Sequence, residues 1–219
     1  MADSPRTSLA RSPYASLRNL TAGGTTGNER LTAAAGVVLL VLLAVIGLTI
    51  ISIRQFLWVH LFVGMLLIGP LVLKLASTGY RFVRYYSGNP SYRRVGPPPA
   101  LLRVIAPMLV LTTIVVFASG VVLLFAGPQS RPTLLPIHKV SFFVWIAFFA
   151  IHVLGHLPAI PRALRADYGS SAPWNLDVTG RSGRAISLAS ALTAGLVLAV
   201  IVIPQFGPWL NASNLFHHH

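Results

Sequence analysis

Five long apolar runs, separated by short polar or basic segments, make up most of the chain. An α-helix needs about 20 mostly apolar residues to cross ~30 Å of hydrocarbon, because each residue adds ~1.5 Å of rise. The sequence therefore predicts an all-α integral membrane protein with five transmembrane helices. We expect them near residues 31–53, 56–78, 101–126, 134–158 and 184–207.

Prolines occur in or near several of these runs. Pro70, Pro107, Pro136 and Pro204 occupy such positions. Proline inside a membrane helix is tolerated as a kink, since neighbouring helices satisfy the freed backbone groups. We therefore expect kinks at these prolines and helix boundaries that differ by several residues from those given above.

The composition agrees with a membrane protein. Of the 219 residues, 54% are hydrophobic and 10% are charged, a balance that a water-soluble domain does not have. Residues 1–30 contain no apolar core long enough for a signal peptide and predict a flexible cytoplasmic tail. Residues 31–210 form the predicted transmembrane domain, and residues 211–219 a C-terminal tail whose three final histidines resemble a purification tag.

The basic residues predict the orientation, because Lys and Arg in short loops stay on the cytoplasmic side. The loops on one side hold only Arg54 and Arg131, with Lys139 just inside the fourth run. We expect a multi-pass protein of the bacterial inner (cytoplasmic) membrane, with the N-terminus in the cytoplasm and the C-terminus outside. The predicted cytoplasmic arginines are Arg6, Arg11, Arg18, Arg30, Arg81, Arg84, Arg93, Arg94, Arg162, Arg165, Arg181 and Arg184.

The formal net charge of +13 does not point to nucleic acid as a partner. The arginines are spread over short loops instead of forming one patch with interleaved aromatic residues, so topology and anionic membrane lipid account for them. The aromatic, basic segment 80–99 is either a docking surface for a partner protein or an interfacial anchor. The absence of cysteine excludes disulfides and cysteine-ligated iron–sulfur clusters.

The histidines before the terminal three all lie in two apolar runs. His60 is in the second run, and His138, His152 and His156 are in the fourth. Both runs are expected to cross from outside to inside, so His60 and His138, each four residues into its run, lie at the same depth near the outer face. Imidazole is a common axial ligand of haem iron, and a porphyrin between two helices needs one base from each at the same height. The pair predicts an outer haem.

A second pair of bases repeats this pattern closer to the cytoplasm. Lys74 follows His60 by fourteen residues, and His152 follows His138 by the same interval. Fourteen residues make nearly four helical turns and ~21 Å of rise, so each pair shares one face of its helix. Polar bases in the membrane mark function by default, although Lys74 near the end of its helix would also reach the headgroups by snorkelling.

Other residues support a haem site less directly. Gly64 and Gly120 would let a flat macrocycle approach the backbone, and Arg54, Arg131 or Lys139 would meet outer propionates. His156 lies one turn beyond His152, where a propionate or lipid contact is expected rather than ligation of iron.

The motifs "LWVHLFVG" around His60, "LPIHKVSF" around His138 and "FAIHVLGH" around His152 carry a resemblance. The five-helix layout with these residues is similar to the bacterial cytochrome b561 and formate dehydrogenase gamma-subunit group, and more distantly to the ferric reductase transmembrane domain. The resemblance covers residues 55–160. It implies a four-helix haem-binding bundle plus one additional helix, haem b near each membrane face, and electron transfer across the membrane.

Lys74 departs from the group, because a second histidine is expected at its position. Three arrangements remain open: Lys74 ligates iron together with His152, the inner haem uses His156 and another base, or only the outer haem exists. A lysine amine binds iron only in its neutral form.

The sequence thus favours a di-haem b-type membrane protein that transfers electrons across the bacterial cytoplasmic membrane, with a transmembrane oxidoreductase as one form of it. Because it contains no flavin or nicotinamide motif, electrons would pass between quinol or a redox partner protein and an acceptor. A membrane anchor subunit of an external oxidoreductase is one alternative. A non-haem metal site on His152 and His156 is another. A transporter is disfavoured, because all four acidic residues lie outside the apolar runs.

Overall fold

The computed structural model describes residues 24–96, 100–156 and 180–215, and the regular structure in these ranges is entirely helical. The all-α prediction is therefore confirmed. The elements are α2 (Gly24–Ile51), α3 (Ile53–Leu66), α4 (Ile68–Tyr86), α5 (Pro90–Val95), α6 (Ala100–Ala126), η1 (Pro128–Ser130), α7 (Arg131–His156), α9 (Arg181–Val202), η3 (Ile203–Phe206) and α10 (Gly207–Leu215).

Five stretches of the described chain are long and apolar enough to cross a membrane, as the sequence predicted. They are Gly24–Ile51, Ile53–Tyr86, Leu102–Ala126, Pro128–Gly155 and Arg181–Ala212.

Two boundaries differ most from the prediction. The first helix begins at Gly24 and so includes part of the expected tail, whereas residues 1–23 lie outside the described ranges. The second continues to Tyr86 and ends where Gly88 adopts a left-handed φ of 84°. The predicted loop between the runs 134–158 and 184–207 falls mostly outside the described residues, as do the three terminal histidines.

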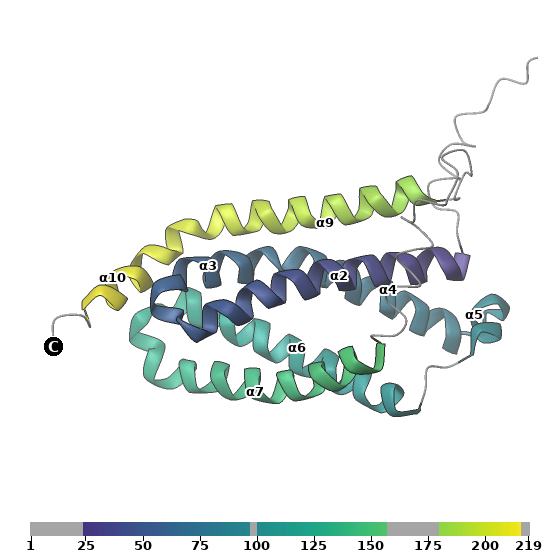
Figure 1. Ribbon diagram of the computed structural model, residues 1–219, viewed down its shortest axis with the longest axis horizontal. Coiled ribbons are helices and arrows are strands. Elements are labelled where there is room, and N and C mark those ends of the chain that lie inside the picture. The colour runs from purple at the N-terminus through teal and green to yellow at the C-terminus, as the bar shows by residue number, and fades with distance from the viewer. Residues whose placement is uncertain (1–23, 97–99, 157–179, 216–219) are drawn as a thin grey trace, which may run out of the picture.

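The long helices lie side by side along the long axis of the molecule (Figure 1). α2 packs against α3, α4 and α9, whereas α6 and α7 form an antiparallel hairpin whose closest contacts are with each other. α3 and α7 start at the same end of the molecule, which also carries η1 and α10. The end opposite carries α5 and the starts of α2, α6 and α9.

The apolar core is centred near the η3 and α10 end. Phe206 of η3 is only 1% exposed and packs with Met65 of α3, Leu124 of α6 and Val202 of α9. The indole Nε1 of Trp209 in α10 donates a hydrogen bond of 3.1 Å to the carbonyl of Leu124. The hairpin is thus joined to the other helices at this end.

A break at Leu67 divides the second membrane helix into α3 and α4. Pro70 has no N–H to donate to the carbonyl of Leu66, which is therefore free of its usual helical partner. Gly195 of α9 lies against this carbonyl, and Gly69 lies against the backbone of α9 in return. Because neither glycine has a side chain, the two helices approach closely at the kink.

The other three prolines behave differently from one another. α6 and α7 continue as helices through Pro107 and Pro136, whereas Pro204 lies in η3, directly after the end of α9. Proline is therefore tolerated inside a helix at Pro107 and Pro136, whereas the α-helix ends just before Pro204.

Large apolar side chains face outward on every long helix. Leu48, Phe82, Val104, Phe143 and Ile201 are between 62% and 68% exposed. Exposed apolar side chains in this number indicate a surface that contacts another protein or the membrane. Together with the five spanning helices, it identifies a multi-pass membrane protein in contact with lipid.

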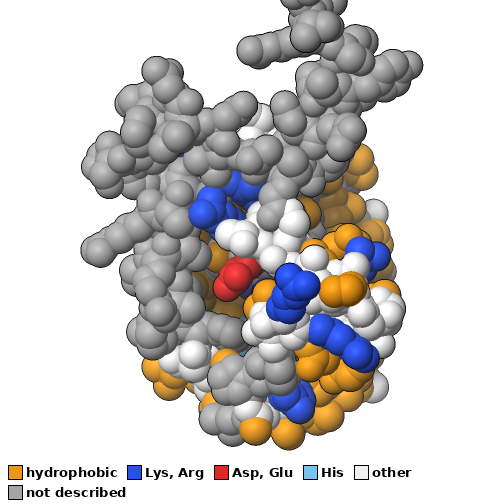
Figure 2. Space-filling model, turned by 90° about the vertical axis from the view of Figure 1, so that its right-hand side faces the viewer, with side chains coloured by type: hydrophobic (Ala, Val, Ile, Leu, Met, Phe, Trp, Pro, Cys, Tyr) orange, Lys and Arg blue, Asp and Glu red, His pale blue; other side chains and the backbone are white. Residues whose placement is uncertain are grey.

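Charged residues gather at the end of the molecule that carries α5 (Figure 2). Glu29 is the one acidic residue of the described ranges, and it lies near the start of α2, which begins at this end. Arg54 and Arg131 lie at the start of α3 and α7, at the opposite end. The arginines in the helix ends near α5 are Arg30, Arg81, Arg84, Arg93, Arg94, Arg103, Arg181 and Arg184.

Candidate functional site

His60 and His138 lie near each other, although the helices that carry them pack mainly against different neighbours. His60 is on α3, which packs against α2 and α9, and His138 is on α7, which packs against α6. The two imidazoles are close enough to interact electrostatically. The structure thus brings together the two histidines that the sequence placed at the same depth.

The ring of His60 is held from α2. Its Nδ1 lies 2.9 Å from Oγ1 of Thr49, a residue that is only 4% exposed. The Thr49 hydroxyl in turn donates a hydrogen bond of 2.6 Å to the carbonyl of Ile46 in its own helix.

The ring of His138 is held in the same way from α6. Its Nδ1 lies 3.0 Å from Oγ of Ser119, and Ser119 donates to the carbonyl of Val116 at 3.0 Å. Ser141 of α7 extends this network, since its Oγ lies 3.3 Å from that of Ser119 and donates to the carbonyl of His138 at 2.8 Å.

Gly120 provides the space for the His138 ring on α6. A Cβ at this position would lie 3.0 Å from Cε1 of His138, closer than side chains normally approach. At Gly64 the corresponding Cβ would meet only Ile46 of α2, at an ordinary 3.8 Å. Of the two glycines that the sequence singled out, Gly120 is therefore the one in contact with a histidine.

The α6–α7 hairpin is tied further along by Trp145. Its Nε1 donates a buried hydrogen bond of 2.9 Å to Oγ1 of Thr113, and its ring stacks on Phe149 with centroids 4.6 Å apart. The Trp145–Thr113 bond and the contact of His138 with Ser119 thus join α7 to α6 at two positions along the hairpin.

Lys74 lies between α4 and α2. Its Nζ donates to the carbonyl of Thr32 at 3.1 Å, and a Cβ at Gly36 would lie only 2.8 Å from the same nitrogen. Ser77 and Asn28 complete this cluster, because Asn28 Nδ2 donates to the Ser77 carbonyl at 3.0 Å. We call Asn28, Thr32, Lys74 and Ser77 the α2–α4 polar cluster.

The inner histidines are on the last turns of α7. His152 is half-buried, and His156 is the final residue of the helix, with a side chain outside the described part of the structure. Among the described residues, no three His, Cys, Asp or Glu side chains converge as a metal site would require. A haem with two axial ligands does not need such a cluster.

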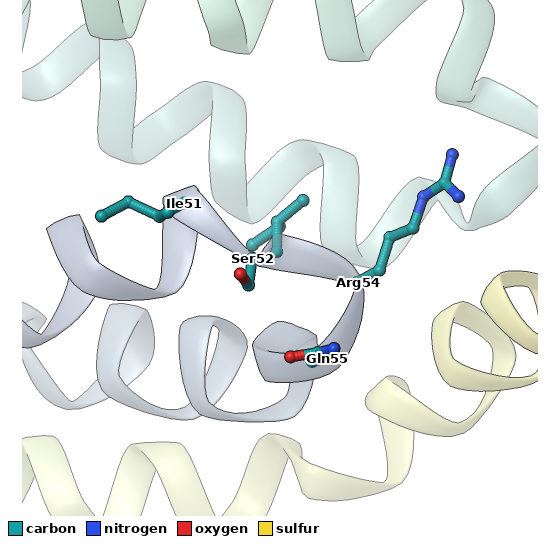
Figure 3. A pocket seen from close by; sticks show the side chains of 5 residues that line it. Ile51, Ser52, Arg54 and Gln55 are labelled. Carbon is teal, nitrogen blue, oxygen red and sulfur yellow. The ribbon is translucent and has the colours of Figure 1, made fainter.

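Arg54 and Arg131 are exposed near the end of the molecule where His60 and His138 lie. The α2–α3 turn, Ile51–Gln55, lines a hollow of about 330 Å³. The side chain of Arg54 extends away from Ser52 and Gln55 in this region (Figure 3). It is therefore free to contact groups beyond the turn.

Thr49, Ser119 and Ser141 were not found from the sequence. Hydroxyl residues are common in membrane helices, where they form hydrogen bonds with their own backbone. A serine or threonine that also contacts a histidine therefore cannot be recognised from the sequence. Only the pairing of α2 with α3 and of α6 with α7 reveals that these hydroxyls meet histidines.

Comparison of the chain with protein-family models, with curated proteins and with solved structures found no match. The function is therefore argued from the geometry of the described residues.

Proposed function

We propose that the chain is a haem b membrane protein that transfers electrons across the bacterial cytoplasmic membrane, with His60 and His138 as axial ligands. The observation that carries the proposal is the pair of neighbouring imidazoles on α3 and α7, each bonded through Nδ1 to a hydroxyl of an adjacent helix. Bacterial cytochrome b561 and the formate dehydrogenase gamma subunit are the groups that it would resemble.

The donor set fits haem better than other cofactors. Two imidazoles satisfy both axial positions of a haem iron, whereas zinc or another non-haem metal needs further ligands. Haem, when bound, supplies a one-electron carrier. The residues of the chain hold it at a fixed depth and exclude water from it with the apolar side chains of the bundle.

Arg54 and Arg131 are the proposed partners of the haem propionates. Both are cationic and exposed, and both begin the helices that carry the two histidines. Guanidinium groups bind carboxylates through paired hydrogen bonds. An outer haem would therefore direct its propionates toward the outer membrane surface.

The distribution of arginine supports the orientation. The end with α5 has most of the described arginines, so it is the cytoplasmic end according to the positive-inside rule. The histidine pair then lies near the outer face. Electrons would come from quinol or from a partner protein.

A second haem between Lys74 and His152 stays a prediction of the sequence. Because the Lys74 amine donates to Thr32 in α2, it would have to give up that bond to reach iron. The proposed haem ligation therefore rests on the outer site, and electron transfer across the whole membrane within one chain would require the inner haem as well.

Separate substitution of the ligands tests the proposal. We expect His60→Ala and His138→Ala each to abolish the low-spin haem spectrum of the purified protein, because one imidazole cannot fill both axial positions. Thr112→Val is the matched control, since Thr112 bonds only to carbonyls of its own helix, at Met108 and Leu109. Full haem content in both histidine variants would overturn the outer site.

A further inference from the structure

The hydroxyl groups of Thr49 and Ser119, which contact the two histidines, each donate a hydrogen bond to a backbone carbonyl of their own helix. The one hydroxyl proton of Thr49 is donated to the carbonyl of Ile46, over a short distance of 2.6 Å. With its proton on this carbonyl, the Thr49 oxygen meets Nδ1 of His60 as an acceptor, and the ring nitrogen supplies the proton of that hydrogen bond.

The same reasoning holds at His138. Ser119 donates its proton to the carbonyl of Val116, or to Oγ of Ser141, whose own proton goes to the carbonyl of His138. In either case Ser119 faces Nδ1 of His138 as an acceptor.

We propose that Thr49 and Ser119 are positioning residues that hold both histidines in the Nδ1–H tautomer. A neutral imidazole with its proton on Nδ1 has a free lone pair on Nε2. Each Nε2 is thereby ready to bind iron without losing a proton. The assignment of iron as the recipient rests on the proposed function, whereas the tautomer follows from the hydrogen bonds alone.

The hydroxyls would also affect the redox properties of a bound haem. An acceptor at Nδ1–H makes the imidazole a stronger electron donor, because it draws the proton away from the ring. A stronger donor favours ferric over ferrous iron. Loss of either acceptor should raise the midpoint potential, by about 59 mV for each tenfold change in the ratio of ferric to ferrous affinity.

The first test reads the tautomers without using haem. The full-length protein is labelled with ¹⁵N-histidine and placed in lipid nanodiscs, and its ring nitrogens are recorded by NMR. We expect His60 and His138 to be protonated at Nδ1. We expect Thr49→Val to change His60 alone and Ser119→Ala to change His138 alone, with Thr49→Ser restoring the wild-type signals.

Controls separate this inference from a general disturbance of the fold. Thr112→Val removes a hydroxyl of α6 that bonds only within its helix, so it should move neither histidine. A proton on Nε2 in the wild type, or unchanged signals in both hydroxyl variants, would overturn the inference.

The second test uses the haem-loaded protein and distinguishes the two proposals. An increased midpoint potential in Thr49→Val and Ser119→Ala, with haem content kept, supports both. Bound haem with an unchanged potential in these variants overturns the tuning role of the hydroxyls. Absence of haem together with the expected tautomers overturns the proposed function and leaves the tautomer inference standing.

Discussion

Single small residues determine where the imidazoles lie. Thr49 and Ser119 bind the Nδ1 atoms, and Gly120 leaves room for the ring of His138 beside α6. Large side chains at these positions would fill the same volume with apolar atoms and displace the rings. The site therefore depends on residues that composition and hydropathy do not distinguish from their neighbours.

Gly120→Ala should disturb the site directly. The added Cβ would lie 3.0 Å from Cε1 of His138, and the hydrogen bond to Ser119 prevents the ring from moving aside easily. Overpacking of this kind costs about 1–3 kcal/mol, so we expect lower haem occupancy and a lower midpoint of thermal unfolding. Gly47→Ala, which meets no atom within 4 Å, is the control, and equal behaviour of the two variants would contradict the account.

Lys74→Met should leave the haem content unchanged. The Lys74 amine donates to Thr32 in α2, and intramembrane hydrogen bonds of this kind contribute about 0.6 kcal/mol on average. We expect a pyridine haemochrome assay to give the wild-type haem per chain, with only a small change in stability. Loss of haem from this variant would instead support ligation of an inner haem by Lys74.

Among the helices, hydropathy predicted which segments span the membrane but not where each of them ends. The five membrane helices followed from the lengths of the apolar runs, because backbone groups in lipid can be satisfied only within helices. The end of α4 did not, since Tyr80 and Arg84 are polar enough to suggest a loop. The helix continues through Gly79, which is not among the glycines with a positive φ, and ends before Gly88, whose φ is 84°.

The contact of α9 with the kink between α3 and α4 gives a prediction for the fold. In Gly195→Ala, the new Cβ would collide with the backbone carbonyl of Leu66, which cannot move away as a flexible side chain would. We expect α9 to shift and the free energy of unfolding to fall by about 1–3 kcal/mol. Thermal unfolding in detergent measures this, with Gly79→Ala as the control because no atom lies near it; identical unfolding curves would show that the close contact is absent.

At the scale of the whole molecule, the structure brings His60 and His138 near each other, whereas ligation by the inner bases stays a prediction of the sequence. The depth of a residue along parallel helices can be estimated by counting residues, so the sequence could predict that His60 and His138 lie at the same depth. The side-chain direction of Lys74 could not be predicted in this way. The kink near Leu67 and Pro70 lies between His60 and Lys74, so counting helical turns from His60 does not give the face on which Lys74 lies. Rotation of each helix about its axis is set by its neighbours, which a single sequence does not reveal.

The uneven distribution of arginine predicts the orientation in the membrane. The chain has no cysteine, so single cysteines can be introduced without background. We expect Gln129→Cys in η1 to react with a membrane-impermeant maleimide added to intact spheroplasts, and Ser91→Cys in α5 to react only after lysis. Both residues are exposed, and the reverse pattern of labelling would invert the proposed topology.

The visible spectrum of the purified wild-type protein tests the central claim most directly. The oxidised and dithionite-reduced spectra are recorded together with a pyridine haemochrome assay for haem per chain. The account predicts a low-spin haem b spectrum with at least one haem per chain. A protein produced with ample haem supply and purified without any haem would contradict it.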